Sequence, residues 1–198
     1  MPGKRPPENN RVAEAEIDPI FIERWSPRAF DPSPLPDGMV KGIFEAAKWA
    51  PSCMNEQPWL FLYAVAETDL KEYLDLLVDG NKAWAKTAPL LAFLFARRNF
   101  RGDNSKNNWA AFDCGAAWMS LTMQARMYGL YTHGMAGFHR DRVCAALGVP
   151  EDEYEPICAI AVGRYGDFNA LPEPLKEREK PNERIPLEKV AHEGRFGS

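Results

Sequence analysis

The sequence predicts one domain of the α+β class, in which helices and strands follow one another irregularly. The chain of 198 residues is long enough for one hydrophobic core, and its composition, 45% hydrophobic and 26% charged, is ordinary for a soluble globular protein. Helical and strand patterns lack the regular βαβ alternation of a parallel sheet, and no internal repeat or low-complexity tract is present. We expect a folded domain at residues 17–166, a flexible N-terminal arm at residues 1–16 and an extended C-terminal arm at residues 167–198.

The N-terminal half predicts two helices and one strand after a polar, aperiodic start. Residues 17–25 carry apolar side chains at a short helical spacing. After a proline-rich loop, Asp37 is placed to cap a helix that runs to about Ala50 along one apolar stripe. Residues 60–66 form a continuous apolar run, which predicts a strand buried on both faces.

From residue 69 onward the sequence predicts three helices and two strands. A helix is expected around residues 69–78 and an apolar strand at residues 90–96. A long helix follows at about residues 109–128, then a short one at about residues 141–147. A further strand is expected at residues 157–162.

The helix at residues 109–128 is apolar nearly all round and ends before Gly129, a natural residue to follow a helix. Its uninterrupted apolar length falls short of the ~20 residues that span a membrane, so we expect no membrane partner. A helix without a polar face must be covered on every side. Because a chain of this length has few layers to cover it, the pattern favours a homodimer.

The C-terminal arm changes character again. Residues 171–186 hold four prolines and eight charged residues, which cannot form a core. The apolar residues Ile185, Leu187 and Val190 then return, although a disordered tail would not need them. An extended arm that packs along a partner chain accounts for both observations.

Several classes of function are disfavoured by what the sequence lacks. A net charge of −4 without clustered Lys and Arg argues against nucleic acid as a partner. The four cysteines lie far apart without a CxxC pair, so we expect no metal site and a reducing, cytoplasmic location. No GxGxxG, P-loop or GxSxG motif is present. A hydrolytic pair of Cys53 and His133 stays open, although a lone cysteine is more often an inert core residue.

Two short motifs carry polar side chains suited to a phosphorylated ligand. The first, RWSPRAF at residues 24–30, places Arg24, Ser26 and Arg28 where they can converge on one phosphate. Arginine suits this task because its planar fork meets phosphate oxygens bidentately. Exposed arginine pairs are, however, more often simply solvated.

The second motif, APSCMNEQPW at residues 50–59, joins a helix end to a buried strand, and prolines stiffen it. Ser52 and Asn55 offer hydroxyl and amide groups to the polar edge of a ligand. The alternative is that they satisfy their own backbone as turn formers.

Together these motifs resemble those of the FMN-dependent nitroreductase family, as RxSxRxF and APSxxNxQPW in this order. The Gly-rich segment THGMAGF at residues 132–138 and the closing RIPLEKV at residues 184–190 are also similar to the family. The match covers residues 19–190. It implies a nitroreductase-like mixed central sheet flanked by helices, in an intertwined homodimer with flavin at the interface. Residues 81–108 have no clear match to a substrate motif.

The resemblance implies a set of FMN-binding residues, in which the first motif and the late arginine grip the phosphate. The second motif would reach the flavin from the other subunit, and the Gly-rich segment would lie along the ring as a turn. The implied residues are Arg24, Trp25, Ser26, Arg28, Pro51, Ser52, Asn55, His133, Gly134, Met135, Gly137 and Arg184.

The resemblance also implies an activity: electrons pass from NAD(P)H through FMN to a nitroaromatic, quinone or similar small-molecule acceptor. No catalytic side chain is expected, because the flavin carries the chemistry. Two alternatives stay open. One is a flavin enzyme of the same scaffold with other chemistry, such as reductive dehalogenation or flavin fragmentation. The other is a non-catalytic FMN-binding module that docks a partner through residues 81–108.

Overall fold

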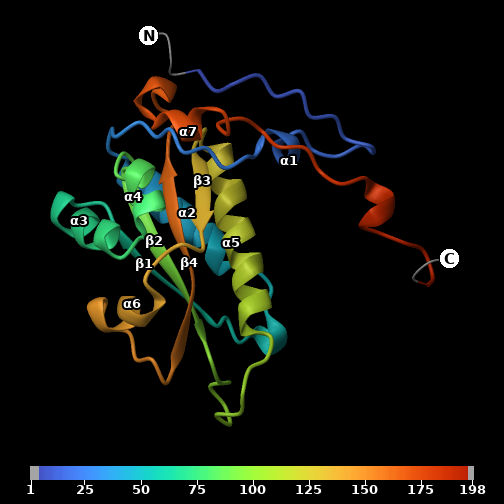
Figure 1. Ribbon diagram of the computed structural model, residues 1–198. Coiled ribbons are helices and arrows are strands. Elements are labelled where there is room, and N and C mark those ends of the chain that lie inside the picture. Colours follow the sequence, from blue (N-terminus) through green and yellow to red (C-terminus); the bar gives the residue numbers. More distant parts are fainter. Residues whose placement is uncertain (1–4, 196–198) are drawn as a thin grey trace.

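The computed structural model describes residues 5–195 and has a four-stranded sheet at its centre (Figure 1). The strand order is β1 (Trp59–Ala64), β2 (Leu90–Arg97), β4 (Tyr154–Gly163) and β3 (Tyr131–Met135). The predicted α+β class is confirmed. All three strand pairings among the described residues are antiparallel, so the sheet within this chain is not of mixed direction.

Helices pack on both faces of the sheet and along the two arms. None of the helices in residues 5–195 is long and apolar enough to cross a membrane. The α-helices are α1 (Ile20–Glu23), α2 (Asp37–Lys48), α3 (Glu67–Asp75), α4 (Asp79–Ala85), α5 (Ala110–Met127), α6 (Arg140–Ala146) and α7 (Glu173–Lys176). The short 3₁₀ turns are η1 (Cys53–Asn55), η2 (Phe168–Ala170) and η3 (Leu187–Lys189).

Two hydrophobic cores lie on opposite faces of the sheet because side chains alternate along the central strands. Leu90, Leu94 and Ile160 face α2 and α5, whereas Phe93 and Ala161 face the side covered by α3, α4 and α6. Figure 1 shows α2 and α5 behind and beside the sheet, and α3, α4 and α6 on its other side. Strand β2 lies at the centre and is almost completely buried, which makes it a poor docking surface for a partner.

Helix α5 lies where the sequence predicts it and ends before Gly129, whose φ of 73° suits glycine. One side of it packs against α2 and the sheet. The other side leaves apolar groups open in the single chain, with Phe112 76% and Met127 66% exposed. Met119 is also exposed between them. An exposed apolar strip of this kind is typical of a surface that another chain covers.

Three sequence expectations are corrected. Strand β1 is an edge strand with half-exposed side chains, not a strand buried on both faces, since within residues 5–195 it pairs with β2 alone. Asp37 is the first residue of α2 and makes no capping bond, because Pro36 occupies the capping position. The segment at 132–138 is not a turn throughout: most of it is β3, which pairs with β4. Helix α4 was not anticipated.

A close backbone contact fixes the first motif to the end of the sheet. Phe30 pairs with Tyr165 just beyond β4, and the backbone N–H of Gly166 donates to the carbonyl of Ala29 over 2.9 Å. Only glycine fits at 166, since a Cβ there would overlap the Phe30 backbone. This contact therefore holds the residues that precede Phe30 at the end of the sheet where β4 finishes.

The two arms lie against one another and extend away from the sheet (Figure 1). Arg11 donates from Nε to the carbonyl of Asn182 over 2.7 Å, and the Leu187 N–H donates to Glu14 over 3.0 Å. The outermost parts of both predicted arms, residues 1–4 and 196–198, lie outside the described residues. The described parts are extended chain with short helical turns.

Candidate functional site

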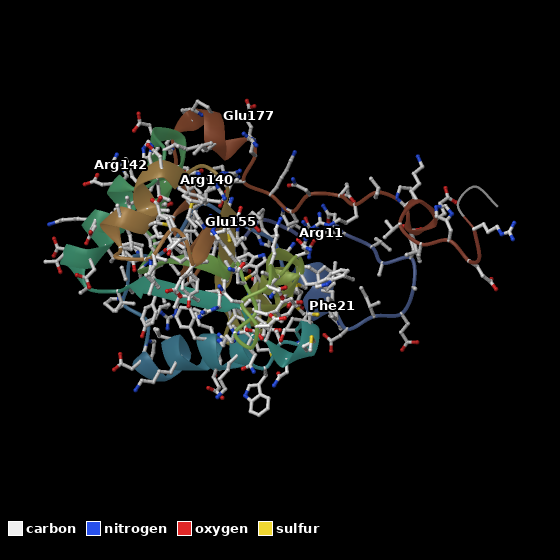
Figure 2. The ribbon with its side chains drawn as sticks, turned by 90° about the horizontal axis from the view of Figure 1, so that it is seen from below. Arg11, Phe21, Arg140, Arg142, Glu155 and Glu177 are labelled. Carbon is white, nitrogen blue, oxygen red and sulfur yellow. The ribbon has the colours of Figure 1, made fainter. Side chains whose placement is uncertain are left out.

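A cavity of about 700 Å³ opens between the first motif, strand β3 and the two arms. It brings together six of the predicted site residues, which are distant in the sequence: Arg24, Trp25, Ser26, Arg28, His133 and Arg184. Six of the lining side chains are cationic and three are carboxylates, so the cavity is suited to an anion. Figure 2 shows Arg11 beside the C-terminal arm and Glu177 near the top of the molecule. Both also line the cavity.

Arg24 is held in the cavity without an acidic partner among the described ion pairs. Its Nη1 lies 3.4 Å from Ser26 Oγ. Burial lowers the pKa of Arg24, and the positive charge of Arg184 lowers it further. Two guanidinium groups and a hydroxyl therefore face one space, where an anion with several oxygens would relieve their repulsion.

Arg28 differs because an acidic residue of the C-terminal arm lies beside it. Its Nη1 lies 3.9 Å from Glu179 Oε2. Burial lowers the pKa of Arg28, the Arg178 charge adds to this, and Glu179 opposes it. Burial raises the pKa of Glu179. The backbone N–H groups of Ala29 and Arg28, which donate to the carboxylate, partly oppose this rise.

His133 forms part of the cavity wall as a neutral imidazole. Its Nδ1 lies 2.8 Å from the carbonyl oxygen of Pro27, which can only accept, so Nδ1 carries the proton. Its ring packs on Trp84 at 4.6 Å between centroids. Burial lowers the pKa of His133 to about 4. Cys53 does not line this cavity and its backbone N–H bonds to Asp113, so Cys53 and His133 do not form a hydrolytic pair within one chain.

The pKa of His133 predicts a pH-dependent stability. The unfolded imidazole, with a pKa of about 6.5, binds protons between about pH 6.5 and about pH 4, where the folded one does not. The free energy that neutral His133 contributes to folding stability is therefore fully present above this window and is lost as the pH falls through it, by about 3 kcal/mol. We expect His133→Asn, which keeps a donor for Pro27, to be less sensitive over this range. Thermal melts at several pH values test this, with His139→Asn as the control. Parallel loss of stability in wild type and His133→Asn would contradict it.

Other predicted residues lie near the cavity or within the core. The Trp25 ring is 5% exposed and packs between Tyr131 and Tyr165, so its indole is mainly a core group. Gly134 and Met135 follow His133 along β3, and the Met135 side chain is buried.

Gly137 lies in the turn after β3 and has a packing role. Its carbonyl accepts from Asn81 Nδ2 over 2.9 Å. A Cβ at 137 would come within 2.7 Å of that nitrogen and 2.8 Å of the Val78 side chain. Gly137 therefore allows α4 to approach the turn closely.

The second motif lies elsewhere in the chain and does not line the cavity. Ser52 Oγ accepts from the Gln57 N–H over 2.9 Å, so in this chain it acts as a turn former. Met54, Asn55 and Gln57 all have φ near +50°, a region that side chains rarely adopt. Such strain persists where surrounding contacts fix the loop. Here the buried Asp113 accepts from the Cys53 N–H over 3.1 Å.

Helix α5 separates the two motifs. Asp113, in its first turn, holds the loop with Ser52 and Asn55, whereas Arg126, near its end, lies 3.6 Å from Glu23. Their separation of thirteen positions corresponds to roughly 20 Å along the helix axis. The loop that carries Pro51, Ser52 and Asn55 therefore lies at the other end of α5 from the start of the first motif. Figure 1 shows α1 at the opposite end of α5 from the chain that follows α2.

Several residues at the cavity are not predicted from the sequence. Arg11 lies in the predicted flexible arm, yet it donates to the carbonyls of Ile22 and Arg24 over 3.1 and 2.9 Å. Two further lining residues, Arg178 and Lys180, and Glu179, which bonds to the Arg28 backbone, lie in the segment that we expected to be an extended arm on a partner chain. Their positions depend on how the arm folds back, and no local pattern marks them.

The fold and the cavity define an α+β protein with a cationic pocket for an anionic ligand. The sequence model of the Nitroreductase family matches residues 22–82 and 76–164. A crystal structure described as the oxidoreductase containing FMN has a TM-score of 0.90 and 43% identity over 97% of this chain and 98% of that chain. This protein belongs to the nitroreductase family.

Two curated relatives are also similar. One is named NADH dehydrogenase, from Thermus thermophilus, and is 28% identical over 200 residues, covering 85% of this chain and 91% of the relative. The other is an uncharacterized 15.4 kDa protein of Mycolicibacterium smegmatis, 40% identical over 124 residues, covering 62% of this chain and 81% of the relative.

Proposed function

We propose that this protein is an NAD(P)H-dependent oxidoreductase that uses bound FMN. The observation that carries the proposal is the group of arginines around the cavity, where Arg24 and Arg184 face one space without an acidic partner for Arg24 among the described ion pairs. A terminal phosphate supplies the missing negative charge. Family membership and the relative described as containing FMN support the same conclusion.

The residues present fit FMN at its phosphate end. The phosphate would be held by Arg24, Ser26, Arg28 and Arg184. His133 would form part of the wall and, because its pKa is lowered to about 4, would carry no charge at neutral pH. When bound, FMN supplies the relay of two electrons from a reduced nicotinamide to an acceptor. The protein's part is to bind and orient, which requires no acid–base side chain. We propose a nitroaromatic, quinone or similar small molecule as the acceptor.

We also propose a homodimer in which each site uses both chains. The loop with Ser52 and Asn55 lies at the other end of α5 from Arg24, so it would serve the site of the partner. The exposed apolar strip of Phe112, Met119 and Met127 and the extended C-terminal arm offer surfaces for the partner to cover. The four cysteines are unpaired, which supports a cytoplasmic location.

The purified protein is expected to be yellow and to release FMN, rather than FAD, on heating. The cavity offers one cluster of cations for one terminal phosphate. Absorbance spectra and chromatography of the released flavin test this, and bleaching by NADH or NADPH tests the activity. A colourless protein that does not take up added FMN would overturn the proposal. Uptake of FMN without reduction by either nicotinamide would indicate a binding module instead.

A further inference from the structure

The C-terminal arm inserts one acidic side chain into the first motif. The Glu179 side chain has no solvent exposure. Its Oε1 accepts from the N–H of Arg28 over 2.8 Å and from that of Ala29 over 2.9 Å, and Oε2 accepts from Arg28 over 3.0 Å. The carboxylate thus binds two successive backbone N–H groups of the segment that carries the phosphate-binding arginines.

Burying a carboxylate costs free energy unless hydrogen bonds satisfy its oxygens. Glu179 can therefore be buried here only in the arrangement of the chain that supplies these donors. The two N–H groups converge only when the motif has its present conformation. Conversely, the motif keeps these donors satisfied only when the arm is docked. The arm and the motif therefore stabilise each other's conformation.

The docked arm also builds one wall of the cavity. Arg178, Lys180 and Arg184 line it, all within five residues of Glu179. The contact of Arg11 with Asn182 fixes the next part of the arm. If the arm undocked at Glu179, the orientation of the Arg28 side chain would change, and the cations that the arm contributes would leave their positions at the cavity.

We propose that Glu179 is a positioning residue that couples docking of the C-terminal arm to binding of the cofactor phosphate. The identity of the ligand rests on the proposed function. Glu179 does not touch the phosphate: it holds the Arg28 backbone, so that the guanidinium faces the cavity. Coupling between two equilibria is reciprocal, so phosphate binding also stabilises the docked arm.

Glu179→Gln tests the proposal, with Glu173→Gln as the matched control on the same arm. Glu173 is exposed and pairs only with Lys176 among the described ion pairs. FMN and riboflavin share the ring and differ in the phosphate, so the ratio of their Kd values isolates the phosphate contribution. We expect Glu179→Gln to reduce the preference for FMN about tenfold or more and to change riboflavin affinity little. A merely structural loss would weaken both ligands alike.

Trypsin cleavage gives a second readout without activity. Cleavage after Lys176 or Arg178 should be slower in wild type with FMN than without it, and faster in Glu179→Gln. If that variant does not fold, Glu179→Asp carries the test, since it keeps the charge but shortens the reach and should lose part of the preference for FMN.

The outcomes separate the two proposals. Wild-type protein that prefers FMN, with an unchanged preference in the Glu179 variants, would overturn the role of Glu179 alone. Equal losses for FMN and riboflavin would also overturn it. Wild-type protein that binds neither flavin would overturn the proposed function, and this inference with it.

Discussion

Arg24→Ala is expected to weaken FMN binding roughly ten- to hundredfold while the apoprotein stays folded. Losing a charge-assisted contact with phosphate costs about 1.5–3 kcal/mol. The apoprotein should lose little stability, because Arg24 lies near the like charge of Arg184 and its pKa is lowered there. Riboflavin, which has no phosphate, should bind both proteins alike. Titrations that follow flavin fluorescence, with parallel thermal melts, measure both quantities.

Arg142→Ala serves as the control for the loss of one arginine, since Arg142 is exposed on α6 and does not line the cavity (Figure 2). Arg28→Ala is a useful comparison, because it leaves the buried Glu179 without its nearby guanidinium and should also lower stability. Unchanged FMN affinity in Arg24→Ala would remove Arg24 from the site.

Mixing two variants with weakened FMN sites is expected to restore activity, measured at an FMN concentration that loads the wild-type site but neither variant, and this is the largest change that we predict. An Arg24→Ala chain lacks the phosphate contact, and an Asn55→Ala chain lacks the loop contact that we propose for the partner's site. In a heterodimer one site carries both defects and the other carries neither. Random exchange of subunits then leaves about one quarter of the sites intact.

The measurement is NAD(P)H oxidation by the mixed sample against each variant alone, after exchange of subunits is shown by mass. A double variant, Arg24→Ala with Asn55→Ala in one chain, is the control, because mixing it with either single variant creates no intact site. If exchange occurs and no activity returns, the two motifs do not form a shared site. Light scattering that shows a fully flavin-loaded monomer would also contradict the dimer.

The fold was largely predictable wherever the signal was local and strong. The apolar run that forms β2 and the all-round apolar pattern that forms α5 placed both elements within one or two residues. Strand β3 was missed because its glycine resembles a turn, and its five residues become a strand only by pairing with β4. Burial of β1 was overestimated because apolar composition does not distinguish an edge strand from a central one.

The candidate site was predictable where its residues are close together in the sequence. Arg24, Ser26 and Arg28 are close in sequence, and their spacing suggested one phosphate. That His133 and Arg184 join them in one cavity depends on pairing along the sheet and on the path of the arm. The sequence by itself determined the class of fold, the family resemblance and the first motif, because these depend on near neighbours in the chain. Only the tertiary structure decided that Arg11 and Glu179 belong to the same site, because their hydrogen-bond partners lie more than ten residues away along the chain. Burial of a side chain and the gathering of several charges around one cavity arise only when such distant segments come together.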